Sequence, residues 1–181
     1  MNVTRTWNTH HINHQPYHLH LGKHHSSTSD LPFHMATPSA PEHNKTETAS
    51  LTVSCTDLAS SLALSLVDSF PAVFATARMV ALMEIASARV LTPFLQPGQL
   101  SVGVSVDVTH SAPTPIGSKV DAEAKYLGRT GKGDKLFEFE VVARDEGGEI
   151  GRARHVRAIV DSKRLEDGAA KRVVKKEVAE L

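Results

Sequence analysis

The chain has 181 residues, the length of one ordinary domain with terminal extensions. Its 20 Lys and Arg residues balance 20 Asp and Glu residues, so the composition favours neither a nucleic-acid partner nor a charged membrane surface. The one cysteine, Cys55, excludes an internal disulfide and fits a reducing compartment such as the cytoplasm. No apolar run reaches the ~18 residues that a membrane-spanning helix requires.

Residues 1–47 form a polar segment that we predict to be disordered. Nine of the eleven histidines lie between His10 and His43, among Asn, Ser, Thr and Pro with few aliphatic side chains. Such a composition cannot bury enough apolar surface to offset the entropy of ordering the segment. The histidines have no regular spacing and no cysteine partners, so we predict no metal site. Arg5 and Lys23 precede the first acid, Asp30, as in a transit peptide, which makes a mitochondrial location the alternative to the cytoplasm.

Residues 48–161 carry the pattern of a folded domain. A strand is predicted over 48–55, and a connecting segment with a short helix over 56–71. The strongest helix signal covers 73–95 and ends at Pro97-Gly98. This helix is apolar on nearly every side, so we expect it to be buried on nearly every side.

Four extended segments follow the helix. They are predicted over 100–112, 119–127, 135–144 and 150–161. In the first, Val102, Val104, Val106 and Val108 alternate with polar residues and are expected to share the face that also carries His110. The connections at 129–134 and 145–148 are typical of hairpin loops. Residues 162–181 form a charged tail that is predicted to be a frayed helix.

One strand, one long helix and an antiparallel meander make an α+β plan. A small antiparallel sheet wrapped around one central helix is the hotdog fold. The edges and the open face of such a sheet require a partner, so we expect a homodimer.

Three side chains of this domain are candidates for chemistry. Glu84 lies within the apolar helix, where a buried carboxylate must be paired, protonated or facing a cavity. It either binds the backbone or an arginine such as Arg89, or it acts as a base or orienting group. His110 is either a satisfied core residue or the partner of that carboxylate. Thr76, where the helix begins, is either an N-cap or a nucleophile beside free N–H groups.

Two glycine positions have structural explanations. Gly103 interrupts a β-branched strand and marks either a bulge or the close approach of a ligand to the backbone. The glycines of 128–133 lack the spacing of a phosphate-binding loop, and a hairpin turn explains them.

Several motifs, in order, resemble the fluoroacetyl-CoA thioesterase family of hotdog proteins. The resemblance covers residues 70–161 and rests on the runs FPAVFAT at 70–76, MVALME at 79–84, LQPGQLSVG at 95–103, VTHSAPTP at 108–115, EIG at 149–151 and HVRA at 155–158. It implies a catalytic site made of Thr76, Glu84 and His110. It also implies that Phe70, Gly103 and Arg157 bind the substrate.

This resemblance implies an acyl-CoA thioesterase that hydrolyses a small acyl-CoA to the free acid and CoA. His110, oriented by Glu84, would activate the Thr76 hydroxyl or a water, with no metal and with the CoA thioester as substrate rather than as a cofactor. Val67 replaces a second aromatic residue of the lid and Arg78 replaces an uncharged residue, so fluoroacetyl specificity is not assigned. The alternatives are a non-catalytic acyl-CoA-binding hotdog module and a hotdog enoyl-CoA hydratase.

Overall fold

The computed structural model describes residues 40–179, and it describes side chains as far as Val173. The prediction of disorder for the histidine-rich segment therefore lies outside the described residues for 1–39. The prediction is wrong for the last residues of that segment, because the first strand begins at Thr46 rather than at residue 48. The helices and strands are β1 (Thr46–Thr52), η1 (Cys55–Asp57), η2 (Ala59–Leu62), α1 (Thr76–Leu91), η3 (Thr92–Phe94), β2 (Gln99–His110), β3 (Lys119–Thr130), β4 (Leu136–Asp145), β5 (Gly148–Asp161) and α2 (Ser162–Ala179).

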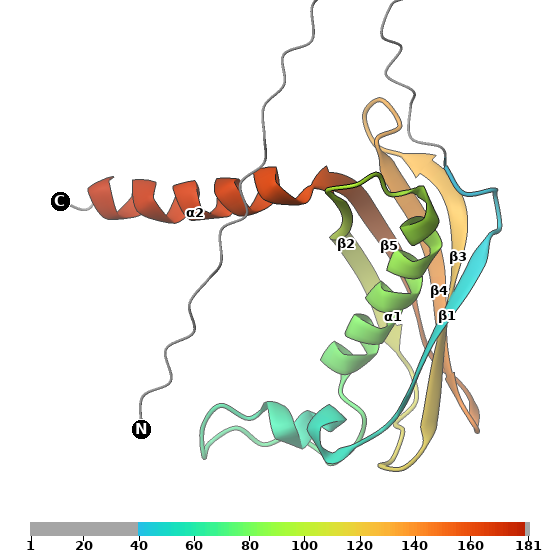
Figure 1. Cartoon of the computed structure of the whole chain (residues 1–181). Helices are drawn as coiled ribbons and strands as arrows, with labels where there is room; N and C mark the ends of the chain where they lie inside the picture. The colour runs from blue at the N-terminus through green and yellow to red at the C-terminus, as the bar shows by residue number, and fades with distance from the viewer. Residues whose placement is uncertain (1–39, 180–181) are drawn as a thin grey trace, which may run out of the picture. The chain divides into compact units, whose positions relative to one another are not determined.

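The five strands form one antiparallel sheet in the order β1-β3-β4-β5-β2. The sheet curves, and α1 lies on its concave face (Figure 1). β1 and β2 are the two edge strands. This arrangement confirms the α+β prediction and the hotdog architecture.

Much of the core lies between α1 and the strands β3 and β4. Alternate residues of β3 and β4 point at the helix, as period-two patterning predicts, and are almost fully buried. Each large apolar side chain buried in this way stabilises the fold by ~1.5–3 kcal/mol. The buried residues of the three elements include Met79, Met83, Ala86, Val90, Val120, Ala122, Tyr126, Phe137, Phe139 and Val141.

Helix α1 is not buried on all sides within one chain, so that prediction is wrong. The face turned away from the core is apolar but partly or fully open, and Ile85 is 47% exposed. Val80, Ala81 and Ala88 share this half-open side. One layer of sheet can cover only the stripe of a helix that faces it. The remaining apolar surface of α1 is not buried by the sheet of its own chain.

The predicted alternation along β2 holds for Val106 and Val108, which pack against the core, but it is wrong for Val104, because the strand contains a β-bulge. Gly103 pairs with Arg157 and Ser105 pairs with Val156, so Val104 has no partner across the ladder. A bulge adds one residue and reverses the faces of everything beyond it. Val104 is consequently 53% exposed, whereas Val106 packs against the core.

The charged tail forms α2, which continues directly from β5 (Figure 1). The Asp161 carboxylate accepts a hydrogen bond from the Arg164 N–H at 2.7 Å, which satisfies one of the free donors at the helix start. In the described part of the chain, no helix is long and apolar enough to cross a membrane. The expected turn between β3 and β4 lies at residues 131–135, where the Asp134 N–H donates to the Gly131 carbonyl. Gly128 lies within β3, at a register shift of its pairing with β4, so a turn does not explain this glycine.

Candidate active site

The first part of the candidate site is the start of α1. Ala75 is the N-cap and has an extended backbone, and Thr76 is the first helical residue. Backbone bonds fix this entry, since the Phe74 N–H donates to Thr114 and the Ala75 N–H donates to Asp57. Thr76 is therefore not the N-cap, and its hydroxyl is free to serve another partner.

That partner is His110, the last residue of β2. A hydrogen bond of 2.9 Å joins Thr76 Oγ1 to His110 Nδ1. The other ring nitrogen, Nε2, is buried and has no partner in the chain. Thr76, His110 and Phe70 all line an open hollow of about 390 Å³ beside the helix start. The structure thus brings together three of the six residues singled out in the sequence.

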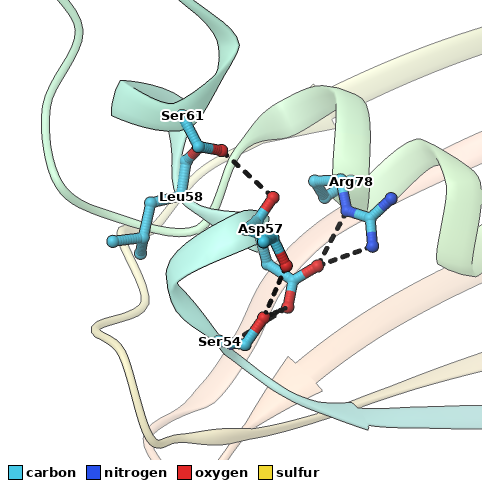
Figure 2. A network of polar contacts seen from close by, with 6 residues as sticks. Ser54, Asp57, Leu58, Ser61 and Arg78 are labelled. Carbon is cyan, nitrogen blue, oxygen red and sulfur yellow. Dashed lines mark hydrogen bonds and ion pairs between the residues drawn. The ribbon is translucent and has the colours of Figure 1, made fainter.

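A polar network holds the segment before α1 against the helix (Figure 2). The carboxylate of Asp57, which is 5% exposed, accepts hydrogen bonds from the Ser54 N–H at 2.9 Å and the Ser54 hydroxyl at 2.6 Å. It also pairs with the Arg78 guanidinium at 2.7 Å. The Ser54 hydroxyl and N–H, with Arg78, hold the pKa of Asp57 below its usual value, against the opposing effect of burial. Arg78 of α1 thus holds the segment around Asp57 against the start of the helix.

The second part of the candidate site surrounds Glu84. Its carboxylate Oε1 lies 3.6 Å from His155 Nε2 and 3.7 Å from Arg157 Nη1. The predicted alternative partner, Arg89, instead donates to the Thr48 carbonyl. No hydrogen bond or ion pair joins Glu84 to His110 within the chain, because Glu84 lies in the middle of α1 and His110 lies beside Thr76 at the start of that helix. Thr76 and Glu84 are eight residues apart, which is about 12 Å along a helix axis.

Arg157 is held in place by β2. It is 5% exposed, and it donates from Nη2 to the Ser101 carbonyl at 2.7 Å and from Nε to the Ser101 hydroxyl at 3.2 Å. Nη1 also reaches the Glu84 carbonyl at 3.4 Å. These bonds fix a positive charge beside the Glu84 carboxylate.

Gly103 completes this second part. A Cβ built at Gly103 would overlap Glu84 Oε1 and would lie 3.3 Å from His155 Nε2. The predicted bulge at this residue is confirmed, whereas the approach of a ligand to its backbone stays a prediction. The group that approaches its backbone in this chain is the Glu84 carboxylate.

His155 is a site residue that sequence reasoning did not select. It is fully buried, and its Nδ1 lies 3.0 Å from the Ser87 hydroxyl. Burial, aided by the positive charge of Arg157, lowers the pKa of His155 to about 4, so the ring is neutral near pH 7. The available signal was its spacing from Arg157: residues i and i+2 of a strand share a face.

The arrangement therefore consists of two groups of side chains on one helix and two strands. The Thr76–His110 group holds a hydroxyl and a base beside free helical N–H groups, which suit an oxyanion. The Glu84 group holds a carboxylate between a guanidinium and a neutral imidazole. Among the described residues, no group of three or more His, Cys, Asp or Glu side chains could hold a metal ion.

Comparison with known proteins identifies the family. Residues 53–163 match the family model described as fluoroacetyl-CoA-specific thioesterase. The chain belongs to this family. A curated member, the fluoroacetyl-CoA thioesterase of Streptantibioticus cattleyicolor, is 44% identical over 91 residues. That match covers 50% of this chain and 63% of the relative, so the chain spans less than two thirds of the relative's length.

Solved structures agree with this family. A structure of the fluoroacetyl-CoA thioesterase FlK, solved for its activity and substrate specificity, is 30% identical with a TM-score of 0.66. It matches 74% of this chain and 98% of its own. A hypothetical protein of Thermus thermophilus, a thioesterase superfamily member, has the same fold at 23% identity and a TM-score of 0.65, over 81% of this chain and all of its own (100%).

Proposed function

We propose that this chain hydrolyses the thioester of a small acyl-CoA, releasing the free acid and CoA. The observation that carries the proposal is the 2.9 Å hydrogen bond between Thr76 and His110 at the free start of α1. It places a nucleophile and a base within reach of each other beside donors for an oxyanion. The hollow of about 390 Å³ next to this pair suits a small acyl group.

In the proposed reaction, the thioester carbonyl lies against the first N–H groups of α1. The Thr76 hydroxyl, or a water in its place, attacks the carbonyl carbon and gives its proton to His110 Nδ1. The C–S bond breaks, and the CoA sulfur leaves with that proton. If Thr76 is the nucleophile, a water then hydrolyses the acyl-threonine by the same proton transfers.

His110 can accept a proton at Nδ1 only if Nε2 already carries one. A buried Nε2–H without an acceptor costs ~1–3 kcal/mol. In the chain this Nε2 has no partner, and Glu84, the predicted partner, lies at the other group. We propose that Glu84 of a second copy supplies the acceptor.

A dimer provides the geometry for such a shared site. β2 is an edge strand, and its ladder groups on one side are unpaired. In a two-fold dimer, two copies of β2 can pair side by side as antiparallel strands. The end of one strand that carries His110 then lies nearer to the part of the other strand that carries Gly103. The half-open apolar face of α1 would be covered by the same association. Each dimer would then have two sites.

The function is tested by a panel of short acyl-CoA thioesters with release of free thiol as the readout. Hydrolysis of at least one thioester is the expected result. Tight binding without thiol release would instead indicate a non-catalytic binding module. Addition of water to an enoyl-CoA without thiol release would indicate a hydratase.

The shared site is tested by complementation. The variants Glu84→Gln and His110→Ala, carrying different tags, are co-expressed, and the mixed dimer is purified by both tags. A shared site leaves one of the two sites intact, so the mixed dimer should recover about half of the wild-type activity. A site built within one chain leaves none intact. Light scattering that gives a monomer with full activity would also contradict the shared site.

A further inference from the structure

A single buried nitrogen of the Glu84 group is left without a hydrogen-bond partner. Two buried side-chain atoms in the described part of the chain lack one, His110 Nε2 and His155 Nε2. The mechanism above uses the first. The second faces Glu84 Oε1 at 3.6 Å and is not used.

The hydrogen bonds around His155 define which nitrogen carries its proton. The Ser87 hydroxyl has one hydrogen, and it donates that hydrogen to the Met83 carbonyl at 2.9 Å. Ser87 Oγ can therefore only accept from His155, so Nδ1 carries the ring proton at 3.0 Å. Since the ring is neutral, Nε2 has a free lone pair and no hydrogen.

This lone pair is aimed at a carboxyl oxygen. A bare nitrogen and an ionised carboxylate are both acceptors, so they cannot bond to each other. If the carboxyl takes up a proton, the same two atoms form an O–H···N hydrogen bond. Gly103 permits this approach, because any side chain there would occupy the space of Glu84 Oε1. Arg157 Nη1 lies 3.7 Å from the same carboxyl oxygen.

We propose that His155 is a positioning residue that accepts a hydrogen bond from protonated Glu84, so that Glu84 can receive a proton during turnover and return it. This inference rests on the proposed function. As His110 becomes doubly protonated, its Nε2 proton shifts to Glu84 Oε1, the new O–H turns toward His155 Nε2, and the proton returns to His110 when CoA leaves. No proton is gained or lost over the cycle, and His155 itself stays neutral.

Two substitutions separate this role from a packing role. In His155→Asn, the shorter amide reaches Ser87 but leaves nothing at the position of Nε2. In His155→Gln, the longer amide returns an acceptor oxygen to that position. We expect His155→Asn to lower kcat roughly tenfold, the effect of one hydrogen bond, with KM unchanged, and His155→Gln to regain most of the loss. Unchanged kcat in His155→Asn, or no recovery in His155→Gln at equal melting temperature, would overturn the proposal.

A second measurement needs no turnover. Nitrogen-15 NMR of the His155 ring should show the proton on Nδ1 and an unprotonated Nε2 at pH 7. Ser87→Ala removes the only acceptor of that proton and should move it to Nε2, where it can bond to Glu84. A proton on Nε2 in the unaltered protein would overturn the proposal even if hydrolysis is observed. If the tautomer is as expected but no thioester is hydrolysed, the proposed function is contradicted. The identification of His155 Nε2 as an acceptor that faces Glu84 would still hold.

Discussion

The two groups of the candidate site are built in opposite ways. The Thr76–His110 pair lies at the exposed start of a helix and beside a loop whose apolar residues are open: Leu66 and Val67 are 107% and 90% exposed. The Glu84 group lies against β5 and the edge strand β2. Its histidine and arginine are 0% and 5% exposed, whereas the Glu84 side chain is 42% exposed. The first group has room for a substrate. In the second group, the histidine and arginine side chains are already buried without a substrate, so substitutions of them should also alter the stability of the fold.

The largest effect should come from the open group. His110→Ala or Thr76→Ala should lower kcat by ~10²–10⁴-fold, because each removes a partner of the proposed proton transfer. The melting temperature should change little, since neither side chain packs in the core. Thr76→Ser keeps the hydroxyl and is the control that should retain most activity. Full hydrolysis by both alanine variants would refute the site.

The packed group should make stability depend on pH. His155 has a pKa of about 4 in the folded chain and about 6.5 unfolded, so below pH 6.5 the unfolded chain binds the extra proton. The stability due to neutral His155 is complete above pH 6.5 and is lost as the pH falls towards 4, for a total of roughly 3 kcal/mol. The charged neighbours of this ring, Glu84 and Arg157, are the same in the wild type and in His155→Asn, so a comparison of these two proteins isolates the histidine. Denaturant unfolding of the wild type and His155→Asn should converge over this range, whereas parallel curves would exclude the buried neutral ring.

The network under the open group should have a smaller effect on stability. Asp57→Asn should cost about 1–3 kcal/mol at pH 7, because it weakens bonds to Ser54 and Arg78 at a buried position. The pKa of Asp57 is lowered in the folded chain, so this difference is present above about pH 4 and should shrink as the pH falls below it. Arg78→Gln should cost less, about 0.2–1 kcal/mol, because Arg78 is 45% exposed. An equal loss in both variants would show that Arg78 alone carries the network.

An effect on kcat should also come from the glycine that lets Glu84 approach the sheet. Gly103→Ala should displace the Glu84 carboxylate and lower kcat roughly tenfold, since a displacement of about 1 Å at a reacting group is enough for such a loss. Gly168→Ala is the matched control, because a Cβ there contacts nothing within 4 Å. Its kcat should not change. Equal kcat values for the two variants would contradict the tight fit of Glu84 against Gly103.

The sequence by itself determined the strands and helix of this domain. The alternation in β3 and β4, the apolar run of α1 and the hairpin turns are local patterns, and each element needs only its own residues to reveal it. The motif order also selected Thr76, Glu84, His110, Phe70, Gly103 and Arg157. The boundaries moved by a few residues, because helix and strand ends depend on backbone partners such as Thr114 and Asp57.

Only the tertiary structure decided which side chains meet. The bulge at Gly103 reversed the faces of β2, and one unpaired residue in a ladder leaves no clear mark in an alternating sequence. The folded sheet places His155 and Arg157 of β5 beside Glu84, and it places His110, at the end of β2, beside Thr76. It also left one apolar face of α1 half open, because a single sheet covers only one side of a helix. Pairing and coverage depend on residues that are far apart in the chain, and local periodicity contains no information about them.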